Sequence, residues 1–194
     1  MIAPTDFRLG LYVHWPFCQK RCPYCDFNVH EVGMGDSTDH QRWAAALVRE
    51  LQHFAPLAQG RLLTSIFFGG GTPSLMQPET VAAVIEAAQA EIGFRNDIEI
   101  SLEANPTSSD ADRFSGFRDA GVNRLSLGIQ SLRDKALLAL GRQHTVEEAL
   151  SALGHARDTF DNISFDLMYA RPRQQFEDWQ AELDEALALK PNHI

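Results

Sequence analysis

The sequence predicts an α/β protein built on a parallel sheet. Short apolar runs alternate with amphipathic helices along the chain, so that one helix separates each run from the next. Strands joined in this way pack as right-handed βαβ units. Five units are complete, and "KPNHI" at 190–194 has the pattern of a turn and the first residues of a sixth strand. We therefore predict a partly closed six-unit (β/α) barrel truncated at the start of the sixth strand. Because a buried strand rarely ends a domain, we expect a fragment of a longer protein.

The elements follow in order along the chain. Buried strands are predicted at 9–15, 64–68, 97–105, 123–129 and 162–169. Helices are predicted at 41–55, at 78–92 with Pro78 in the first turn, near 109–119 with a stop at Gly121, after Thr145, and at 176–189. Thr145 and Glu148 form a capping box that marks the start of their helix. The first helix presents Trp43, Leu47, Leu51 and Phe54 on one face.

The composition is that of an ordinary globular protein, with 44% hydrophobic and 22% charged residues. Seventeen basic residues against 26 acidic ones leave a formal charge of −9, which argues against a nucleic-acid surface and an anionic membrane surface. Residues 1–15 lack a secretory signal, and no run of about 18 apolar residues predicts a membrane span. Three clustered cysteines indicate a reducing compartment. We expect a cytoplasmic protein.

The three cysteines, Cys18, Cys22 and Cys25, form a C-x3-C-x2-C loop directly after the first strand. Thiolates at such short spacings can surround one soft metal centre. A structural zinc ion takes four ligands, and His14 or His30 could supply the fourth. Three thiolates can instead hold three irons of a [4Fe–4S] cluster and leave the fourth iron open. The loop alone leaves both interpretations open, beside that of inert buried thiols.

Polar or glycine residues stand at the carboxyl ends of the next four strands. Gly69, Gly70, Gly71 and Thr72 follow the second strand, Glu103 ends the third, Gln130 follows the fourth and Asp166 lies in the fifth. Arg142, after a short helix, could reach the same rim, where its guanidinium suits a carboxylate. Ligands of parallel α/β sheets bind outside these strand ends. A tight turn explains the glycines alone, and a solvated charge explains any single acid. Four such ends together predict a site for a small polar ligand beside the metal centre.

The cysteine spacing, with aromatic Tyr24 before the last cysteine, resembles the signature of the radical S-adenosylmethionine (radical SAM) superfamily. The motifs "LYVHWPFC", "CPYCDFN", "FFGGGTPSLM", "SLEANP", "AGVNRLSLGIQS", "LGRQHT" and "FDLMY" are similar to those of its oxygen-independent coproporphyrinogen III oxidase group. The resemblance covers residues 9–194. It implies a barrel of the radical SAM type, in which Cys18, Cys22 and Cys25 hold a [4Fe–4S] cluster. The open iron would bind the amine and carboxylate of S-adenosylmethionine.

The resemblance also implies the remainder of the cofactor site. Tyr12 and Tyr24 would lie against the cofactor, Gly70, Gly71 and Thr72 would bind its methionine part, and Glu103, Gln130, Arg142 and Asp166 would complete the contacts. Reductive cleavage to a 5′-deoxyadenosyl radical is the chemistry of the superfamily, performed by the cofactor and the cluster while the protein orients them.

Phe27 distinguishes two branches of the group. The oxidases resemble C-x3-C-x2-C-x-C, whereas Phe27 occupies the position of the last cysteine here, as in the heme chaperone branch. We therefore expect heme binding and transfer to a partner respiratory protein. The enzyme alternative is oxidative decarboxylation of coproporphyrinogen III to protoporphyrinogen IX. A zinc-stabilised binding module is the alternative of another class.

Two features depart from the group. "YARPRQ" at 169–174 stands where relatives have Tyr-Gly-Leu-Pro, a small or polar residue and Gln. Ala170 and Arg171 thus replace a flexible glycine and an apolar residue. The C-terminal domain of the group is absent, so we expect residues 1–194 to be an incomplete radical SAM core.

Overall fold

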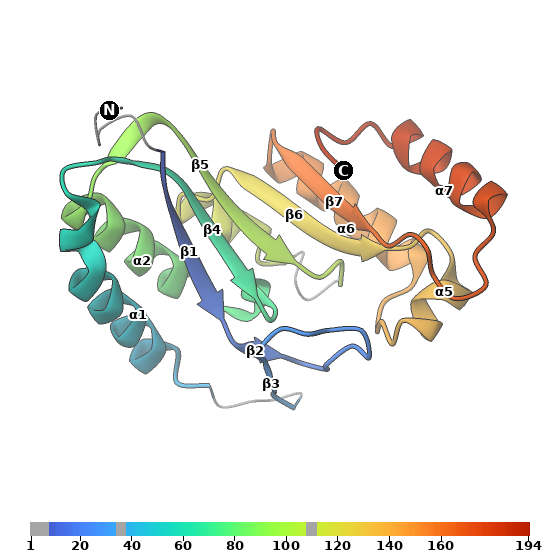
Figure 1. The fold of residues 1–194 in the computed structure, drawn as a ribbon, viewed down its shortest axis with the longest axis horizontal. Coiled ribbons are helices and arrows are strands. Elements are labelled where there is room, and N and C mark those ends of the chain that lie inside the picture. The colour runs from blue at the N-terminus through green and yellow to red at the C-terminus, as the bar shows by residue number, and fades with distance from the viewer. Residues whose placement is uncertain (1–7, 34–37, 108–111) are drawn as a thin grey trace, which may run out of the picture.

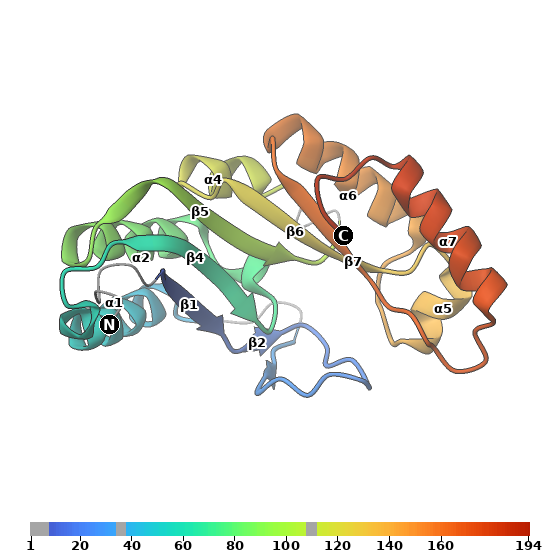
Figure 2. The ribbon, with the colours of Figure 1, turned by 45° about the horizontal axis from the view of Figure 1, so that its top comes forward.

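The computed structural model describes residues 8–33, 38–107 and 112–194. Five parallel strands form its main sheet, in the order β1 (Leu9–Trp15), β4 (Leu63–Gly70), β5 (Phe94–Ala104), β6 (Arg124–Gln130) and β7 (Ile163–Leu167). The spatial order of these strands is their order in the chain, and the sheet bends into an open arc (Figures 1 and 2). The predicted α/β fold with a parallel, barrel-like sheet is confirmed, and the barrel is not closed.

Helices cover one face of this sheet. They are α1 (His40–Phe54), α2 (Pro78–Glu91), α4 (Phe114–Asp119) and α6 (Val146–Thr159); Figure 2 labels all four, with α1 beside β1 and α4 behind β5 and β6. The helices α5 (Asp134–Ala139) and α7 (Phe176–Ala188) lie at the β7 end of the arc. Two short 3₁₀ turns, η2 (Ala55–Ala58) and η3 (Pro73–Leu75), follow α1 and β4.

The two faces of the sheet differ in polarity because side chains alternate along each strand. Residues on the helix-covered face, such as Phe68, Leu102, Leu125 and Phe165, are fully buried in the core. The opposite, concave face carries serines and charged groups. Arg124 donates to Ser101 Oγ (3.0 Å) and Ser164 Oγ (2.9 Å), and further hydrogen bonds join Glu99 and Ser126 to the same network. The part of the concave face formed by β5, β6 and β7 is therefore polar.

The glycines predicted to follow the second strand begin inside it. β4 extends to Gly70, so Gly69 and Gly70 lie inside the strand and not after it as predicted. A Cβ atom at Gly69 would lie 2.9 Å from the Phe67 ring and 3.0 Å from the Tyr12 ring. Gly69 is therefore the residue that lets β4 pass beneath the aromatic rings of the concave face.

Several predicted boundaries are confirmed, and so is the predicted apolar face of α1. Thr145 caps α6 through the capping box with Glu148, and Gly121 adopts a positive φ of 107° just after α4. The start of the helix predicted near 109–119 falls partly outside the described residues, and α4 itself begins at Phe114. On α1, Leu51 is buried, and Phe54, although 51% exposed, lines a cavity against the sheet together with Leu47 and Leu51.

The last residues begin to pair with β7. His193 forms an isolated parallel bridge with Ser164, and Asn192 N donates to Ile163 O (3.1 Å). The side chain of Asn192 accepts in turn from Ile163 N (3.0 Å). The expected turn into a sixth strand is thus visible as a single bridge. Within the described residues, no helix is both long enough and apolar enough to cross a membrane.

Candidate functional site

The cysteine loop leaves the carboxyl end of β1 and is held at its two ends. Its strands β2 (Phe17–Cys18) and β3 (His30–Glu31) pair in parallel, with His30 N donating to Pro16 O (2.7 Å) and Val32 N to Cys18 O (2.8 Å). Inside the loop, Arg21 N donates to the Glu31 carboxylate (2.7 Å). These bonds fix a loop that carries little apolar surface of its own.

The glycines after β4 pass closely beneath this loop. Gly71 N donates to Trp15 O (2.7 Å), and Thr72 N donates to Phe17 O (2.8 Å). A Cβ atom would lie 2.6 Å from His14 Nδ1 at Gly70 and 2.5 Å from Phe17 O at Gly71. The glycines are therefore required to pack the end of β4 against the start of the cysteine loop, whatever they contact in a ligand.

Eleven of the twelve predicted site residues line one pocket of about 210 Å³ at the carboxyl edge of the sheet. They are Cys18, Cys22, Tyr24, Cys25, Gly70, Gly71, Thr72, Glu103, Gln130, Arg142 and Asp166. They come from the cysteine loop, the ends of β4 to β7 and the segment after α5. The convergence predicted from the strand ends is therefore present in the structure.

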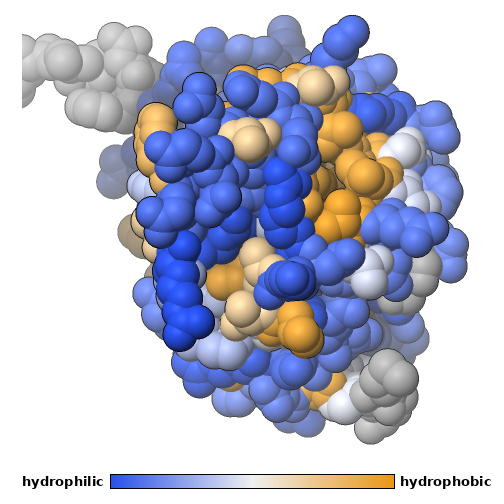
Figure 3. Space-filling view, turned by 90° about the vertical axis from the view of Figure 1, so that its right-hand side faces the viewer, coloured by the Kyte–Doolittle hydropathy of each residue, from blue (hydrophilic) through white to orange (hydrophobic). Residues whose placement is uncertain are grey.

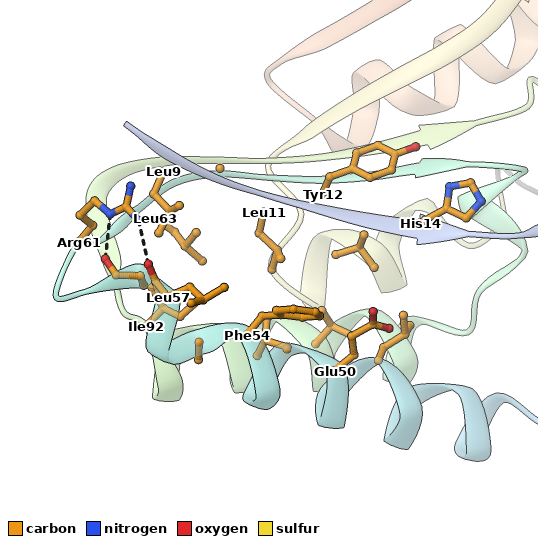
Figure 4. A pocket seen from close by; sticks show the side chains of 17 residues that line it. Leu9, Leu11, Tyr12, His14, Glu50, Phe54, Leu57, Arg61, Leu63 and Ile92 are labelled. Atoms are coloured by element: carbon orange, nitrogen blue, oxygen red, sulfur yellow. Dashed lines mark hydrogen bonds between the residues drawn. The ribbon is translucent and has the colours of Figure 1, made fainter. Parts of the chain in front are cut away.

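Tyr12 is the predicted residue that lies outside this pocket. Figure 4 shows its ring on the side of β1 away from α1, whereas Leu11 points toward that helix. Tyr12 is thus on the concave face, where it stacks on Phe67 with ring centroids 6.1 Å apart. Burial and then the charge of Glu103 raise the pKa of Tyr12, so the phenol faces the acidic side of the site.

A separate apolar cavity of about 390 Å³ lies between β1 and α1 (Figure 4). Its walls include Leu11, Leu47, Phe54 and Ile92, and Arg61 closes one end by donating to Ala58 O and Leu57 O. It belongs to the packing between sheet and helix and contains none of the cysteines.

All three cysteines are free thiols. In the described part of the chain, no three His, Cys, Asp or Glu side chains come close enough together to enclose one metal ion. Neither His14 nor His30, the histidines considered for zinc, lines the cysteine pocket; His14 Nε2 lies 3.0 Å from Asn28 O. The thiols are therefore distributed around the pocket, without a histidine beside them.

Arg142 is the main cation of the pocket. Its Nη1 donates to Cys22 Sγ (3.6 Å), and its Nη2 donates to Asn105 Oδ1 (2.6 Å) and Gly128 O (3.0 Å). Its Nε is buried and has no hydrogen-bond partner. An unpaired buried donor is costly, so this N–H fits a bound anionic group such as a carboxylate.

Cys18 and Tyr24, both in the cysteine loop, also have raised pKa values. Burial raises the pKa of Cys18, and a hydrogen bond from the Thr72 hydroxyl opposes this shift. Burial also raises the pKa of Tyr24 to about 12, with Arg142 acting in the opposite direction. Tyr24 therefore stays a neutral phenol beside the thiols.

The two carboxyl groups of the pocket, Glu103 and Asp166, both have raised pKa values. Burial, and next the charge of Asp166, raise the pKa of Glu103 to about 7, while the backbone N–H of Gly70 opposes the shift. Asp166 is exposed at the mouth of the pocket, yet partial burial of its carboxylate raises its pKa too, against the pull of Arg124, Arg142 and His193. Raised carboxylate pKa values are typical of ligand sites.

Gln130 reaches the pocket through a strained backbone. It ends β6 with a φ of 67°, and its carbonyl accepts from Met168 N (2.9 Å). Behind it, buried His144 lies with Nε2 3.1 Å from Ile129 O, and burial lowers the pKa of His144. Residues held in the left-handed region cluster at functional sites, because the surrounding structure imposes them.

Sequence reasoning missed several residues of this pocket, of which Asn105 is the most connected. Its Nδ2 donates to Thr72 Oγ1 (3.3 Å), and its Oδ1 accepts from Arg142. The only signal was its place in "EANP", two residues after Glu103 at the end of the predicted strand 97–105. Ser126 and Gly128 also line the pocket, from the concave face of β6.

A wider groove of about 800 Å³ adjoins this pocket, and Tyr24 lines both. Pro23 and Tyr24 form one wall, and α5, α7 and residues 168–174 form the others. Large apolar side chains are exposed here and nearby, among them Leu138, Tyr169 and Phe176. Figure 3 shows apolar patches among hydrophilic residues on the face of the molecule that carries α5 and α7.

Three free thiols, two carboxyl groups with raised pKa values and an unpaired guanidinium N–H lie together at the carboxyl edge of a parallel α/β half-barrel. The family model of the radical SAM superfamily matches residues 12–186, and the chain belongs to this superfamily.

Two curated proteins and one solved structure are similar to this chain over almost its whole length. The chain is 45% identical over 193 residues to bovine radical S-adenosyl methionine domain-containing protein 1, mitochondrial, covering 99% of this chain and 43% of that protein. It is 42% identical over 191 residues to the heme chaperone HemW of Haemophilus influenzae, covering 96% and 49%. The solved structure of Escherichia coli coproporphyrinogen III oxidase (HemN), a radical SAM enzyme, superimposes with a TM-score of 0.80 at 31% identity, covering 95% of this chain and 42% of that one. The chain spans less than half the length of these proteins.

Proposed function

We propose that this chain is the radical SAM core of a heme chaperone: it binds a [4Fe–4S] cluster and S-adenosylmethionine in the cysteine pocket, and heme for transfer to a partner protein. The convergence of three free thiols with Glu103, Gln130, Arg142 and Asp166 in one pocket carries the proposal. The relatives named heme chaperone support the heme part.

The residues present fit the cluster. Cys18, Cys22 and Cys25 would each hold one iron, since all three line one pocket, and neither His14 nor His30 lines it as a fourth ligand for zinc. Free thiols also suit a reducing compartment, and we propose the cytoplasm.

The residues also fit S-adenosylmethionine. The unpaired Nε of Arg142 is suited to the carboxylate, and Glu103 and Asp166 offer acceptors for the amine and hydroxyl groups. The carboxamide of Gln130 is held toward the pocket by its left-handed backbone. When bound, cluster and cofactor supply the reductive formation of a 5′-deoxyadenosyl radical. The role of the protein chain would be to orient the cluster and S-adenosylmethionine, with Tyr24 excluding water from the pocket.

Heme is assigned to the groove beside the pocket. The groove joins apolar walls to the cations Lys135 and Arg173, which are suited to propionate groups. Phe27, which the resemblance places where the oxidases have a cysteine, lines the cofactor pocket and favours the chaperone over the oxidase. The fit to HemN is the observation that favours the second candidate, oxygen-independent coproporphyrinogen III oxidation.

Anaerobic reconstitution of the chain with iron and sulfide tests the proposal. We expect about four irons per chain and an EPR signal of the reduced protein that changes on addition of S-adenosylmethionine. Cys22→Ser should abolish the signal, and the matched variant His30→Ala should leave it intact. One zinc per chain that is lost in His30→Ala, with no cluster formed, would overturn the proposal in favour of the zinc module.

The choice between chaperone and oxidase needs a second assay. We expect a heme titration to give a saturable absorbance change, with no protoporphyrinogen IX formed from coproporphyrinogen III in the presence of reductant and S-adenosylmethionine. Porphyrinogen turnover with methionine and 5′-deoxyadenosine as coproducts would identify the oxidase.

A further inference from the structure

We infer that Asn105 is the positioning residue of the cysteine pocket: its carboxamide orients Thr72 and Arg142 so that both donate hydrogen bonds to cysteine sulfur atoms. The inference rests on the proposed function, since its consequence concerns the cluster that these cysteines would hold. Asn105 follows β5 and lines the same pocket as the cysteines.

The contacts of Asn105 fix the orientation of its amide. A guanidinium can only donate, so the atom that contacts Arg142 Nη2 at 2.6 Å is the amide oxygen. The amide nitrogen then faces Thr72 Oγ1 at 3.3 Å and donates to it. No flip of the side chain satisfies both neighbours.

This orientation determines where the Thr72 hydroxyl donates. Because Thr72 Oγ1 accepts from Asn105, its own hydrogen is directed elsewhere. Cys18 lines the same pocket, and Thr72 lowers the pKa of this thiol, which is the effect of a hydroxyl that donates to its sulfur. On the other side, Arg142 Nη1 donates to Cys22 Sγ at 3.6 Å while Nη2 is held by Asn105. One amide therefore connects two sulfur atoms that come from different turns of the loop.

The chemical consequence is electrostatic. Hydrogen bonds to the sulfur ligands of an iron–sulfur cluster stabilise its reduced, more negative state and raise its reduction potential. Asn105 touches no sulfur itself and acts through Thr72 and Arg142. Its loss should therefore lower the midpoint potential of the cluster without removing any ligand.

Two variants distinguish the contact of Asn105 with Thr72 from its contact with Arg142. Asn105→Ala removes both contacts. Asn105→Asp keeps an acceptor for Arg142 but cannot donate to Thr72, so the Thr72 hydroxyl turns to the new carboxylate and leaves Cys18. Asn123→Ala is the matched control, because Asn123 uses both ends of its amide on the backbone of Ile100 and Ile98 at the opposite end of β6.

The test is an EPR-monitored redox titration of the reconstituted chain, with iron content and melting temperature measured in parallel. We expect a more negative midpoint potential in both Asn105 variants. Asn123→Ala should show a lower melting temperature and an unchanged potential. Unchanged potentials in both Asn105 variants at normal iron content would overturn the inference.

Should an Asn105 variant fail to take up iron, the crystal structure of that unloaded variant decides. Thr72 and Arg142 side chains turned away from the sulfur atoms support the inference, and unmoved side chains overturn it. This measurement needs no cluster. A wild-type chain that loads no cluster would therefore contradict the proposed function while the positions of these side chains could still be tested.

Discussion

Glu103 shares its pocket with Asp166, and burial together with the like charge of Asp166 raises the pKa of Glu103 to about 7. In the unfolded chain the same carboxyl titrates near its ordinary value of 4.5. The folded state thus holds this proton more tightly. The resulting stabilisation is complete below about pH 4.5 and is lost as the pH rises through 7.

Glu103→Gln, which keeps the side chain neutral, should therefore gain stability only at the higher pH. We expect the variant to be more stable than the wild type by about 1–2 kcal/mol at pH 8, allowing for partial exposure, and equal to it at pH 4.5. Urea unfolding at both pH values measures this. The exposed α6 residue Glu147, changed to Gln, is the control; an equal effect of Glu103→Gln at both pH values would contradict the prediction.

A buried ion pair explains the unusual residue Arg171. Its guanidinium contacts Glu182 and Ser131, and Glu182, only 1% exposed, also accepts from Leu132 N (2.8 Å). Burial raises the pKa of Glu182, but Arg171 and these donors outweigh burial and lower it. The pair therefore fastens α7 to the loop that follows Gln130.

Arg171→Leu, which restores the residue of the group, should destabilise this chain by about 3–5 kcal/mol because it leaves Glu182 buried without a cation. Adding Glu182→Met should recover most of the loss. Denaturant unfolding of the single and double variants checks both statements, and a neutral Arg171→Leu would show that the pair contributes nothing. Because the pKa of Glu182 is lowered in the fold, the contribution of the pair is present above the ordinary carboxyl pKa and is lost as the pH falls through the folded value.

Ala170, beside this pair, occupies a conformation that suits glycine. Its φ is 55°, in the left-handed region where a Cβ atom is strained. Ala170→Gly should therefore raise the free energy of unfolding by about 0.5–1 kcal/mol. The same exchange in the middle of α7, Ala181→Gly, should lower it by about 1 kcal/mol. Thermal unfolding distinguishes these opposite signs, and a loss at both positions would exclude strain at Ala170.

The φ of Gly71 is not in the left-handed region, so glycine is needed there only because a Cβ atom would not fit. A Cβ atom would lie 2.5 Å from Phe17 O and 2.9 Å from Trp15 O, where the end of β4 meets the cysteine loop. Gly71→Ala should cost about 1–3 kcal/mol and reduce iron uptake on reconstitution. Gly154→Ala in α6, where nothing lies within 4 Å, should instead stabilise by about 0.5–1 kcal/mol. Normal iron uptake by Gly71→Ala would show that the loop tolerates the shift.

Most of the pocket could be predicted because parallel strands end at a common edge. Glu103, Gln130 and Asp166 are far apart in the chain, but each belongs to the last residues of a strand, and the structure brings all three together. Tyr12 follows the same alternation but lies three residues before the end of β1 at Trp15, so it faces the inside of the arc below the pocket.

The remaining contacts depend on side chains whose direction no local pattern reveals. An asparagine before a proline reads as a turn residue, yet Asn105 bonds to residues 33 and 37 positions away. The sequence marked Arg171 only as a departure from the group, because its partner Glu182 lies on a helix that follows it in the chain. The glycine run indicated ligand contacts, whereas its closest neighbours are the backbone and rings of β1 and the cysteine loop.

The consecutive order of the strands also sets a sequence of events during synthesis. The ribosome makes the three thiols before it makes Asn105, Arg142 and Asp166, which line the same pocket. Each new strand pairs with the one made before it, so the arc can grow from its amino-terminal edge as the chain emerges. A nascent chain therefore carries three thiols with an incomplete pocket around them, open to oxidation and to stray metal ions, until Asp166 has been made.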